Sequence, residues 1–200
     1  MDQMRRALQT GTRTSRGFSL IELLVVLAII GIVAVLAIPS ISLALVGSRI
    51  DSAGQMISDS FGQARQEAVA KDRDVQVRFY KLTSGWCAFQ IFRAEPSASG
   101  STLVAVTPVR LLPQGIVISS TLSPLLTADA AISGTVTLPV YGATAYAGFY
   151  FLPSGQTESA LTTQNNYVTV QGAHASGSPP SNYSTLQINL VTGKVEAYRP

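Results

Sequence analysis

The hydrophobic pattern of the chain changes twice between its start and residue 75. Residues 18–38 form an apolar run of 21 residues that holds a single charge, Glu22. From Leu43 to Ala68 apolar positions recur at steps of three and four, which predicts an amphipathic helix. Beyond residue 75 the spacing becomes two, and Gly, Pro and Ser separate the apolar runs. That pattern predicts short strands joined by turns.

The order of these elements predicts the fold class. One long helix followed by strands indicates an α+β fold, in which the second half of the helix packs on an antiparallel sheet. Residues 71–74 are expected to end the helix, 191–193 to form a hairpin loop and 173–182 a longer loop. We interpret the apolar stripe at 50–70 as core rather than as contact with another protein. The expected strands cover 75–80, 86–93, 103–111, 115–120, 134–140, 147–152, 166–171, 184–190 and 193–198.

The apolar run is long enough to cross a membrane. As a helix rising ~1.5 Å per residue, residues 18–38 would span about 32 Å. A buried core helix is disfavoured because the run is apolar on every side and follows a basic leader. A secretory signal usually has an apolar region of about 7–15 residues and a small-residue cleavage site. Here the run continues through 39–45 without a clear break. A single-pass anchor remains an alternative.

The charges are distributed unevenly along the chain. Residues 1–17 hold four arginines and one aspartate, a net charge of +3 that equals the net charge of the whole chain. The positive flank is expected to stay in the cytoplasm, so residues 46–200 should be exported across the inner membrane. The rest of the chain is neutral, which argues against nucleic acid as its main partner.

Glu22 distinguishes among the remaining interpretations of the apolar run. A carboxylate in hydrocarbon costs about 2.5–3.5 kcal/mol on insertion scales, so it needs a positive partner that a plain anchor would not supply. The residues around it, from Arg16 through Gly17 and Phe18 to Glu22 (RGFSLIE), closely resemble the processing signal of type IV pilins and pseudopilins.

The resemblance implies specific chemistry. A prepilin peptidase would cut after Gly17 and methylate the new amino group of Phe18, while the apolar helix stays on the mature chain. Glu22 would then meet the amino terminus of a neighbouring pilin subunit, and Pro39 would kink the helix. The implied organisation is a removed cytoplasmic leader at 1–17, a transmembrane and assembly helix at 18–45 and an exported pilin-like domain at 46–200.

Two further resemblances concern the part of the chain beyond the apolar run. The first, spread over residues 60–198, is to the GspH/FimT group of minor pilins and pseudopilins, and the second, which is closer, is to the Verru_Chthon cassette protein D family. The first is carried by the segments 64–68, 85–86, 151–155 and 193–195, together with Val77. The second is carried by the segments 54–56, 64–66, 77–81, 179–183 and 192–200.

The candidate catalytic and metal-binding residues are few. His174 is the only histidine and Cys87 the only cysteine. We interpret His174 as a surface-loop residue and Cys87 as a small buried apolar residue of a strand. Asp72 and Asp74 are too few for a calcium site and are expected to lie in the turn that ends the helix. The sequence therefore predicts no enzyme activity, metal, cofactor or small-molecule substrate.

The predicted function is that of a pilin-like structural subunit, either a minor pilin or a pseudopilin, of a type IV pilus-like or type II secretion filament. One alternative is a membrane-anchored exported module for binding or adhesion. A less favoured alternative is a minor pilin for DNA uptake, because few basic residues follow Arg110. Only Lys194 and Arg199 do so, and the acids Asp129, Glu158 and Glu196 outnumber them.

Overall fold

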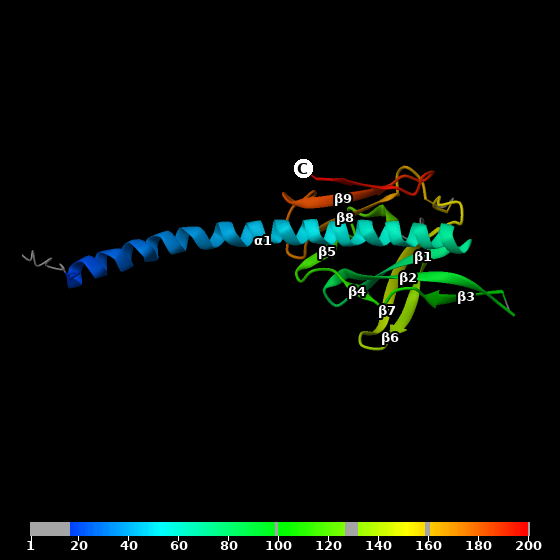
Figure 1. The fold of residues 1–200 in the computed structure, drawn as a ribbon, viewed down its shortest axis with the longest axis horizontal. Helices are drawn as coiled ribbons and strands as arrows, with labels where there is room; N and C mark the ends of the chain where they lie inside the picture. The colour runs from blue at the N-terminus through cyan, green and yellow to red at the C-terminus, as the bar shows by residue number, and fades with distance from the viewer. Residues whose placement is uncertain (1–16, 99, 127–131, 159–160, 200) are drawn as a thin grey trace, which may run out of the picture. The chain divides into compact units, whose positions relative to one another are not determined.

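The computed structural model describes residues 17–98, 100–126, 132–158 and 161–199, and of residues 35–44 it describes the backbone only. Within these residues the chain forms a long helix, α1 (Leu20–Lys71), a short 3-10 helix, η1 (Pro124–Leu126), and ten strands (Figure 1). The chain divides into two compact units, residues 1–42 and residues 43–200. α1 contributes residues to both units, and the second unit holds the strands.

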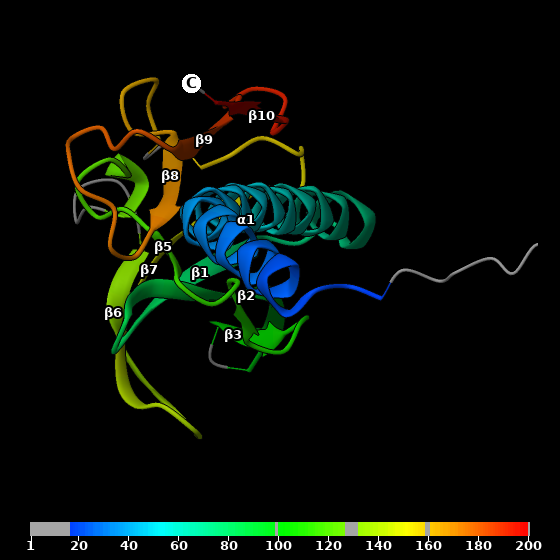
Figure 2. The same cartoon turned by 90° about the vertical axis from the view of Figure 1, so that its left-hand side faces the viewer.

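The described strands of the second unit form one antiparallel sheet. Its order is β10-β9-β8-β5-β2-β1-β7-β6, with β3 and β4 also pairing with β2. In Figure 2 the sheet curves around the part of α1 that belongs to this unit, from β1 and β2 on one side to β9 and β10 on the other. The α+β class predicted from the sequence is confirmed. The strands are β1 (Val75–Leu82), β2 (Gly85–Ser97), β3 (Gly100–Ala105), β4 (Arg110–Leu111), β5 (Ile116–Ile118), β6 (Ile132–Leu138), β7 (Gly142–Phe151), β8 (Tyr167–Gly172), β9 (Tyr183–Ile188) and β10 (Val195–Tyr198).

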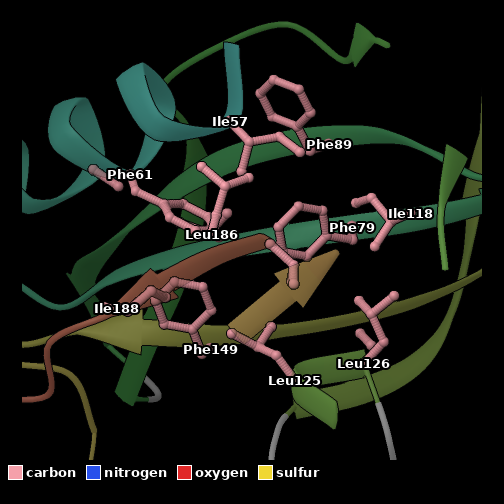
Figure 3. Packing of buried hydrophobic residues seen from close by; sticks show 14 of the residues in the cluster. Ile57, Phe61, Phe79, Phe89, Ile118, Leu125, Leu126, Phe149, Leu186 and Ile188 are labelled. Carbon is pink, nitrogen blue, oxygen red and sulfur yellow. The ribbon is translucent and has the colours of Figure 1, made fainter. Parts of the chain in front are cut away.

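The apolar stripe of α1 forms the centre of the hydrophobic core, as predicted. Phe61 lies at the middle of this core, with its ring centroid 5.3 Å from that of Phe149 and 6.0 Å from that of Phe79 (Figure 3). Each fully buried aromatic or aliphatic side chain stabilises the fold by about 1.5–3 kcal/mol. The apolar residues of this stripe with no exposed surface are Ile50, Ala53, Ile57, Phe61, Ala64 and Ala68.

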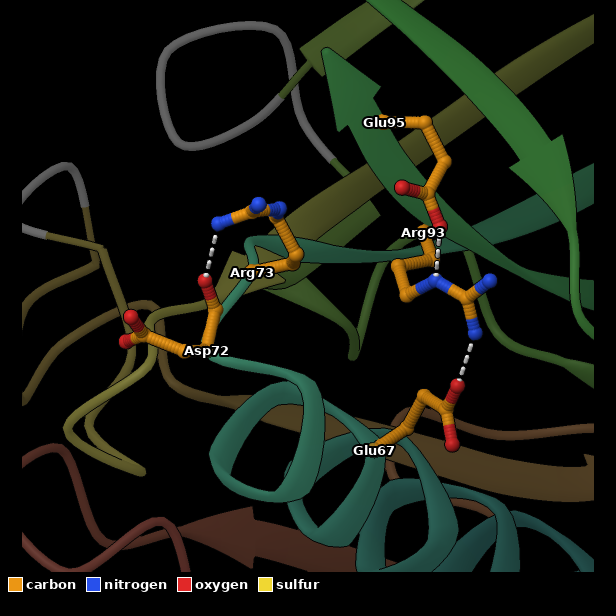
Figure 4. Close-up of polar contacts among 5 residues, drawn as sticks. All are labelled: Glu67, Asp72, Arg73, Arg93 and Glu95. Atoms are coloured by element: carbon orange, nitrogen blue, oxygen red, sulfur yellow. Dashed lines mark hydrogen bonds and ion pairs between the residues drawn. The ribbon is translucent and has the colours of Figure 1, made fainter.

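The end of α1 is fixed by a turn and by an ion-pair cluster. Asp72 adopts a left-handed conformation with φ of 52°, which stops the helix directly after Lys71. The guanidinium of Arg93 on β2 pairs with Glu67 of α1 through Nη1 and with Glu95 through Nε (Figure 4). The predicted helix end is therefore confirmed, and the cluster joins the last turns of the helix to the sheet.

The strand predicted at 103–111 is wrong as a single element. The structure has two strands there, β3 and β4, separated by residues 106–109. Pro108 has no backbone N–H to donate to a ladder. At this break the Thr107 side-chain oxygen accepts a hydrogen bond from the Ile91 N–H at 3.1 Å, which satisfies a buried donor of β2. The 3-10 helix η1 was also not expected from the sequence.

The face of β1 that points away from α1 carries a half-buried cation. The guanidinium carbon of Arg78 lies 4.2 Å from the ring centroid of Tyr146 and 4.7 Å from that of Phe92. Its Nε donates to Oε1 of Gln76 at 2.7 Å. Two aromatic rings and an amide therefore replace the ion pair that a buried arginine usually requires.

Candidate functional site at the start of the long helix

Ser19 begins α1 through its side chain and its carbonyl. The backbone N–H of Glu22 donates to the Ser19 hydroxyl oxygen at 3.2 Å and to the Ser19 carbonyl at 3.1 Å. The N–H of Leu23 also donates to the Ser19 carbonyl, at 3.2 Å. This places Ser19 at the N-cap and Glu22 three residues later, in the first turn. A serine followed at this spacing by a glutamate is a capping-box pattern. The capping role of Ser19 was missed in the sequence, although the pattern was visible there.

The Gly17–Phe18 bond lies just before this helix start. Residues 17–19 have no regular secondary structure, and the Phe18 side chain is 78% exposed. A Cβ atom built at Gly17 would meet nothing within 4 Å. Within the described residues, the fold therefore places no steric demand for glycine at position 17.

The helix that follows exposes its large apolar residues. From Leu20 to Val33 these residues are 43–83% exposed. Glu22 is exposed among them. A continuous exposed apolar surface of this kind marks contact with another protein or with a membrane. The large apolar side chains are those of Leu20, Ile21, Leu23, Leu24, Val25, Val26, Leu27, Ile29, Ile30, Ile32 and Val33.

Two expectations for this segment stay predictions. Within the described residues, no helix has the combined length and mean hydropathy of a membrane-span candidate. The side chain of Pro39 lies outside the described residues, although the backbone of α1 continues as helix through this position. The kink predicted at Pro39 is therefore not tested.

The other residues considered as candidates lie on different elements of the second unit. Cys87 is buried on β2, and its sulfur lies 3.2 Å from the hydroxyl oxygen of Ser84. His174 is exposed in the loop after β8. Asp72 and Asp74 lie in the turn after α1, and no group of three or more metal-binding side chains occurs in the described part of the chain. Cys87 and His174 thus occupy the environments expected from the sequence.

Comparison with known protein families identifies the N-terminal segment. Residues 12–38 match the model of the prokaryotic N-terminal methylation motif. This is the prepilin-type motif, so the likeness to type IV pilins and pseudopilins drawn from residues 16–22 is confirmed. No curated protein sequence matches the chain at a significant level.

Solved structures with a similar fold include two of the minor pseudopilin EpsH from the type II secretion system of Vibrio cholerae. The first is 12% identical with a TM-score of 0.48, and the match covers 78% of this chain and 96% of that one. The second is 11% identical with a TM-score of 0.43, and the match covers 76% and 98%. The likeness to Verru_Chthon cassette protein D finds no support in these matches and stays a prediction.

Proposed function

We propose that this chain, whose N-terminal segment carries the prepilin-type methylation motif, is a structural subunit of a type IV pilus-like or type II secretion filament. The subunit would be a minor pilin or a pseudopilin. The observation that carries the proposal is the match of residues 12–38 to the motif. The motif coincides with an exposed Gly17–Phe18 bond and with a helical segment whose large apolar residues are exposed.

Processing would occur at the Gly17–Phe18 bond. A prepilin peptidase would remove residues 1–17 and transfer a methyl group to the amino group of Phe18. The irregular backbone before Leu20 and the exposure of Phe18 support access of an enzyme to this bond. Because the described residues leave open space around position 17, the requirement for glycine would come from the peptidase.

The helix would hold the subunit in the inner membrane before assembly. Residues 18–45 would span the bilayer, and the four arginines of the leader would keep the amino end in the cytoplasm. Residues 46–200 would then be exported. In the filament the exposed apolar surface of residues 20–33 would pack against the same segment of other subunits, which removes it from water.

Glu22 would connect one subunit to the next. Cleavage leaves Phe18 with a positive amino group, and Glu22 of a neighbour would pair with that group inside the apolar bundle. Each charge offsets part of the desolvation cost of the other. Within its own chain Glu22 also stands in the first turn of α1, where a negative charge is favourable for the helix dipole.

Intact-mass measurement of the protein extracted from membranes with an active prepilin peptidase tests the proposal. The expected mass is that of a chain that begins at Phe18 and carries one additional methyl group. The variant Gly17→Leu should show the unprocessed mass. A wild-type chain that still holds residues 1–17 would overturn the proposed function.

A further inference from the structure

A cleft of about 470 Å³ opens in the second unit beside the first helical residues of that unit. Val46 and Arg49 of α1 form one wall, the loop around Gly115 forms another, and the loop at 173–182 closes the third side. The last residue of β8, Gly172, reaches the helix: a Cβ atom there would lie 3.7 Å from the Val46 side chain. Three segments distant in the sequence therefore shape this cleft.

The described lining of the cleft holds one formally charged side chain, the cation of Arg49. Arg49 and His174 line it, and none of its described lining residues is acidic. Arg49 donates one hydrogen bond from Nη1 to the carbonyl of Gln114 at 3.4 Å, which orients the guanidinium along the wall. Arg199 donates to the side-chain oxygen of Asn182, a lining residue, while it pairs with Asp51 outside the lining. A cleft with this lining attracts an anion, whereas residues 18–200 as a whole are neutral.

The walls of the cleft are mixed in character. Val46, Ile116 and Pro180 supply apolar surface, while Gln114 and Asn182 supply hydrogen-bonding groups. An amphiphilic ligand with an anionic head suits such walls better than a simple inorganic ion. Arginine is a favoured partner for phosphate because its planar group donates two parallel hydrogen bonds.

The position of the cleft in the chain identifies the source of this anion. Val46 directly follows the apolar segment 18–45, so the cleft-forming turn of α1 is the first one expected beyond the bilayer. We propose that the cleft binds the phosphate headgroup of an anionic phospholipid, with Arg49 as the main contact and His174 as the second. This rests on the membrane anchoring proposed above. The headgroup would hold the exported unit at the membrane surface before the subunit enters a filament.

A larger neighbouring cavity, which shares Gln114, Gly115 and Ile116 with the cleft, provides a contrast. A cavity of about 660 Å³ lies between the β1–β2 turn and the loop before β5, and Leu82, Leu111 and Tyr141 are among its lining residues. Its described lining holds no arginine, lysine or histidine. It therefore lacks the group that would recognise a phosphate, and it serves as an internal comparison for the cleft beside Arg49.

Nuclear magnetic resonance of the full chain tests the proposal directly, because His174 is the only histidine in the sequence. The chain is labelled with ¹⁵N and ¹³C at histidine and held in micelles of a non-ionic detergent. The imidazole signal is followed during addition of dihexanoyl phosphatidylglycerol, dihexanoyl phosphatidylcholine or inorganic phosphate. We expect a saturable shift with the phosphatidylglycerol, at least tenfold weaker binding of the phosphatidylcholine and no shift with inorganic phosphate.

Three variants make the test specific. Arg49→Gln should weaken binding of the phosphatidylglycerol at least tenfold, and Ala175→Trp should abolish the shift by filling the cleft. Arg73→Gln removes a charge from the turn after α1 and should leave binding unchanged. The amide spectrum of each variant shows whether the fold is retained.

Equal affinity for the two lipids, or an Arg49→Gln variant that binds like the wild type, would overturn the proposal. If inorganic phosphate binds with the same affinity as the phosphatidylglycerol, the proposal that the ligand is a lipid is overturned. Failure of this proposal can be distinguished from failure of the proposed function. If the chain extracted from membranes still has its unprocessed mass, the proposed role as a filament subunit is contradicted, whatever the lipid titration shows.

Discussion

The backbone N–H of Glu22 donates to the hydroxyl oxygen of Ser19 at 3.2 Å, so the acid of the prepilin-type motif stands in the turn that Ser19 begins. Two roles meet in this turn. Ser19 satisfies backbone donors of its own helix, whereas Glu22 is exposed and is proposed to pair with another subunit. Substitutions at the two positions should therefore have different consequences.

Ser19→Ala removes the cap and leaves the carboxylate in place. Loss of an N-cap serine costs about 1 kcal/mol of helix stability, so the first turn of α1 should fray. Processing and incorporation into filaments should persist at a level near that of the wild type. Hydrogen exchange at the amides of Glu22 and Leu23, together with the yield of sheared filaments, measures both effects. Loss of filaments equal to that of a Glu22 variant would contradict this separation of roles.

Phe61→Ala should destabilise the second unit strongly. The side chain has no exposed surface and packs edge to face with Phe79 and Phe149, so its removal leaves a cavity in the core. The expected loss in the free energy of unfolding is about 3–5 kcal/mol. Denaturant titration followed by the fluorescence of Trp86, the only tryptophan, measures it. The exposed helix variant Ser52→Ala should change the free energy by less than about 0.5 kcal/mol.

Two glycine substitutions should change stability in opposite directions. Gly193 has φ of +64°, and a Cβ atom there would lie 2.2 Å from the carbonyl oxygen of Gly155, so Gly193→Ala should destabilise the chain by more than about 1 kcal/mol. Gly62 lies in α1 with open space around it, and Gly62→Ala should stabilise the chain by about 0.5–1 kcal/mol. The same denaturant titration compares the two variants. If Gly193→Ala stabilises the chain, the close approach of residue 193 to the Gly155 carbonyl is contradicted.

Glu158 should make the second unit less stable as the pH rises. Burial raises the pKa of its carboxyl, although the Tyr150 N–H donates to Oε1 at 3.0 Å and opposes that rise. An acid with a raised pKa in the folded state stabilises the fold most below its unfolded pKa of about 4.3. That stabilisation is lost as the pH rises through the folded pKa.

Glu158→Gln keeps an oxygen acceptor for Tyr150 and removes the ionisation. The variant should be more stable than the wild type at pH 7. The part of the loss of stability with rising pH that Glu158 causes should disappear. Thermal unfolding between pH 4 and pH 8 measures this difference. Asp59→Asn, at an exposed position of α1, should leave the decline in place. A glutamine variant less stable than the wild type at pH 7 would contradict the role of burial.

The parts of the molecule that depend on local periodicity could be predicted from the sequence. The helix stripe from Ile50 to Ala68 is periodic, so its burial was predictable, and the hairpin loop at 191–193 follows from its turn residues. The break at Pro108 was missed because a strand interrupted by one proline still has an alternating pattern. The 3-10 helix η1 was missed because it holds only three residues.

Features that depend on long-range pairing were not predictable. Arg78 lies over Phe92 and Tyr146 only because β1 pairs in register with both β2 and β7. The cleft beside Arg49 requires the loop at His174 to return to the start of the second unit. A single sequence contains no local signal for such a return. The prepilin-type motif itself was predictable because it is one continuous stretch of sequence, whereas cleavage after Gly17 and the assembly role of Glu22 stay predictions.

The recovery of a Glu22→Ala variant in sheared surface filaments or pseudopilus complexes tests the central claim most directly. The variant should insert in the membrane, lose residues 1–17 and become methylated like the wild type, because the peptidase reads the Gly17–Phe18 bond. It should be absent from assemblies, because the amino group of a neighbouring Phe18 would be buried without a partner at a cost of about 3–5 kcal/mol. A processed Glu22→Ala chain recovered in filaments at the wild-type level would contradict the account.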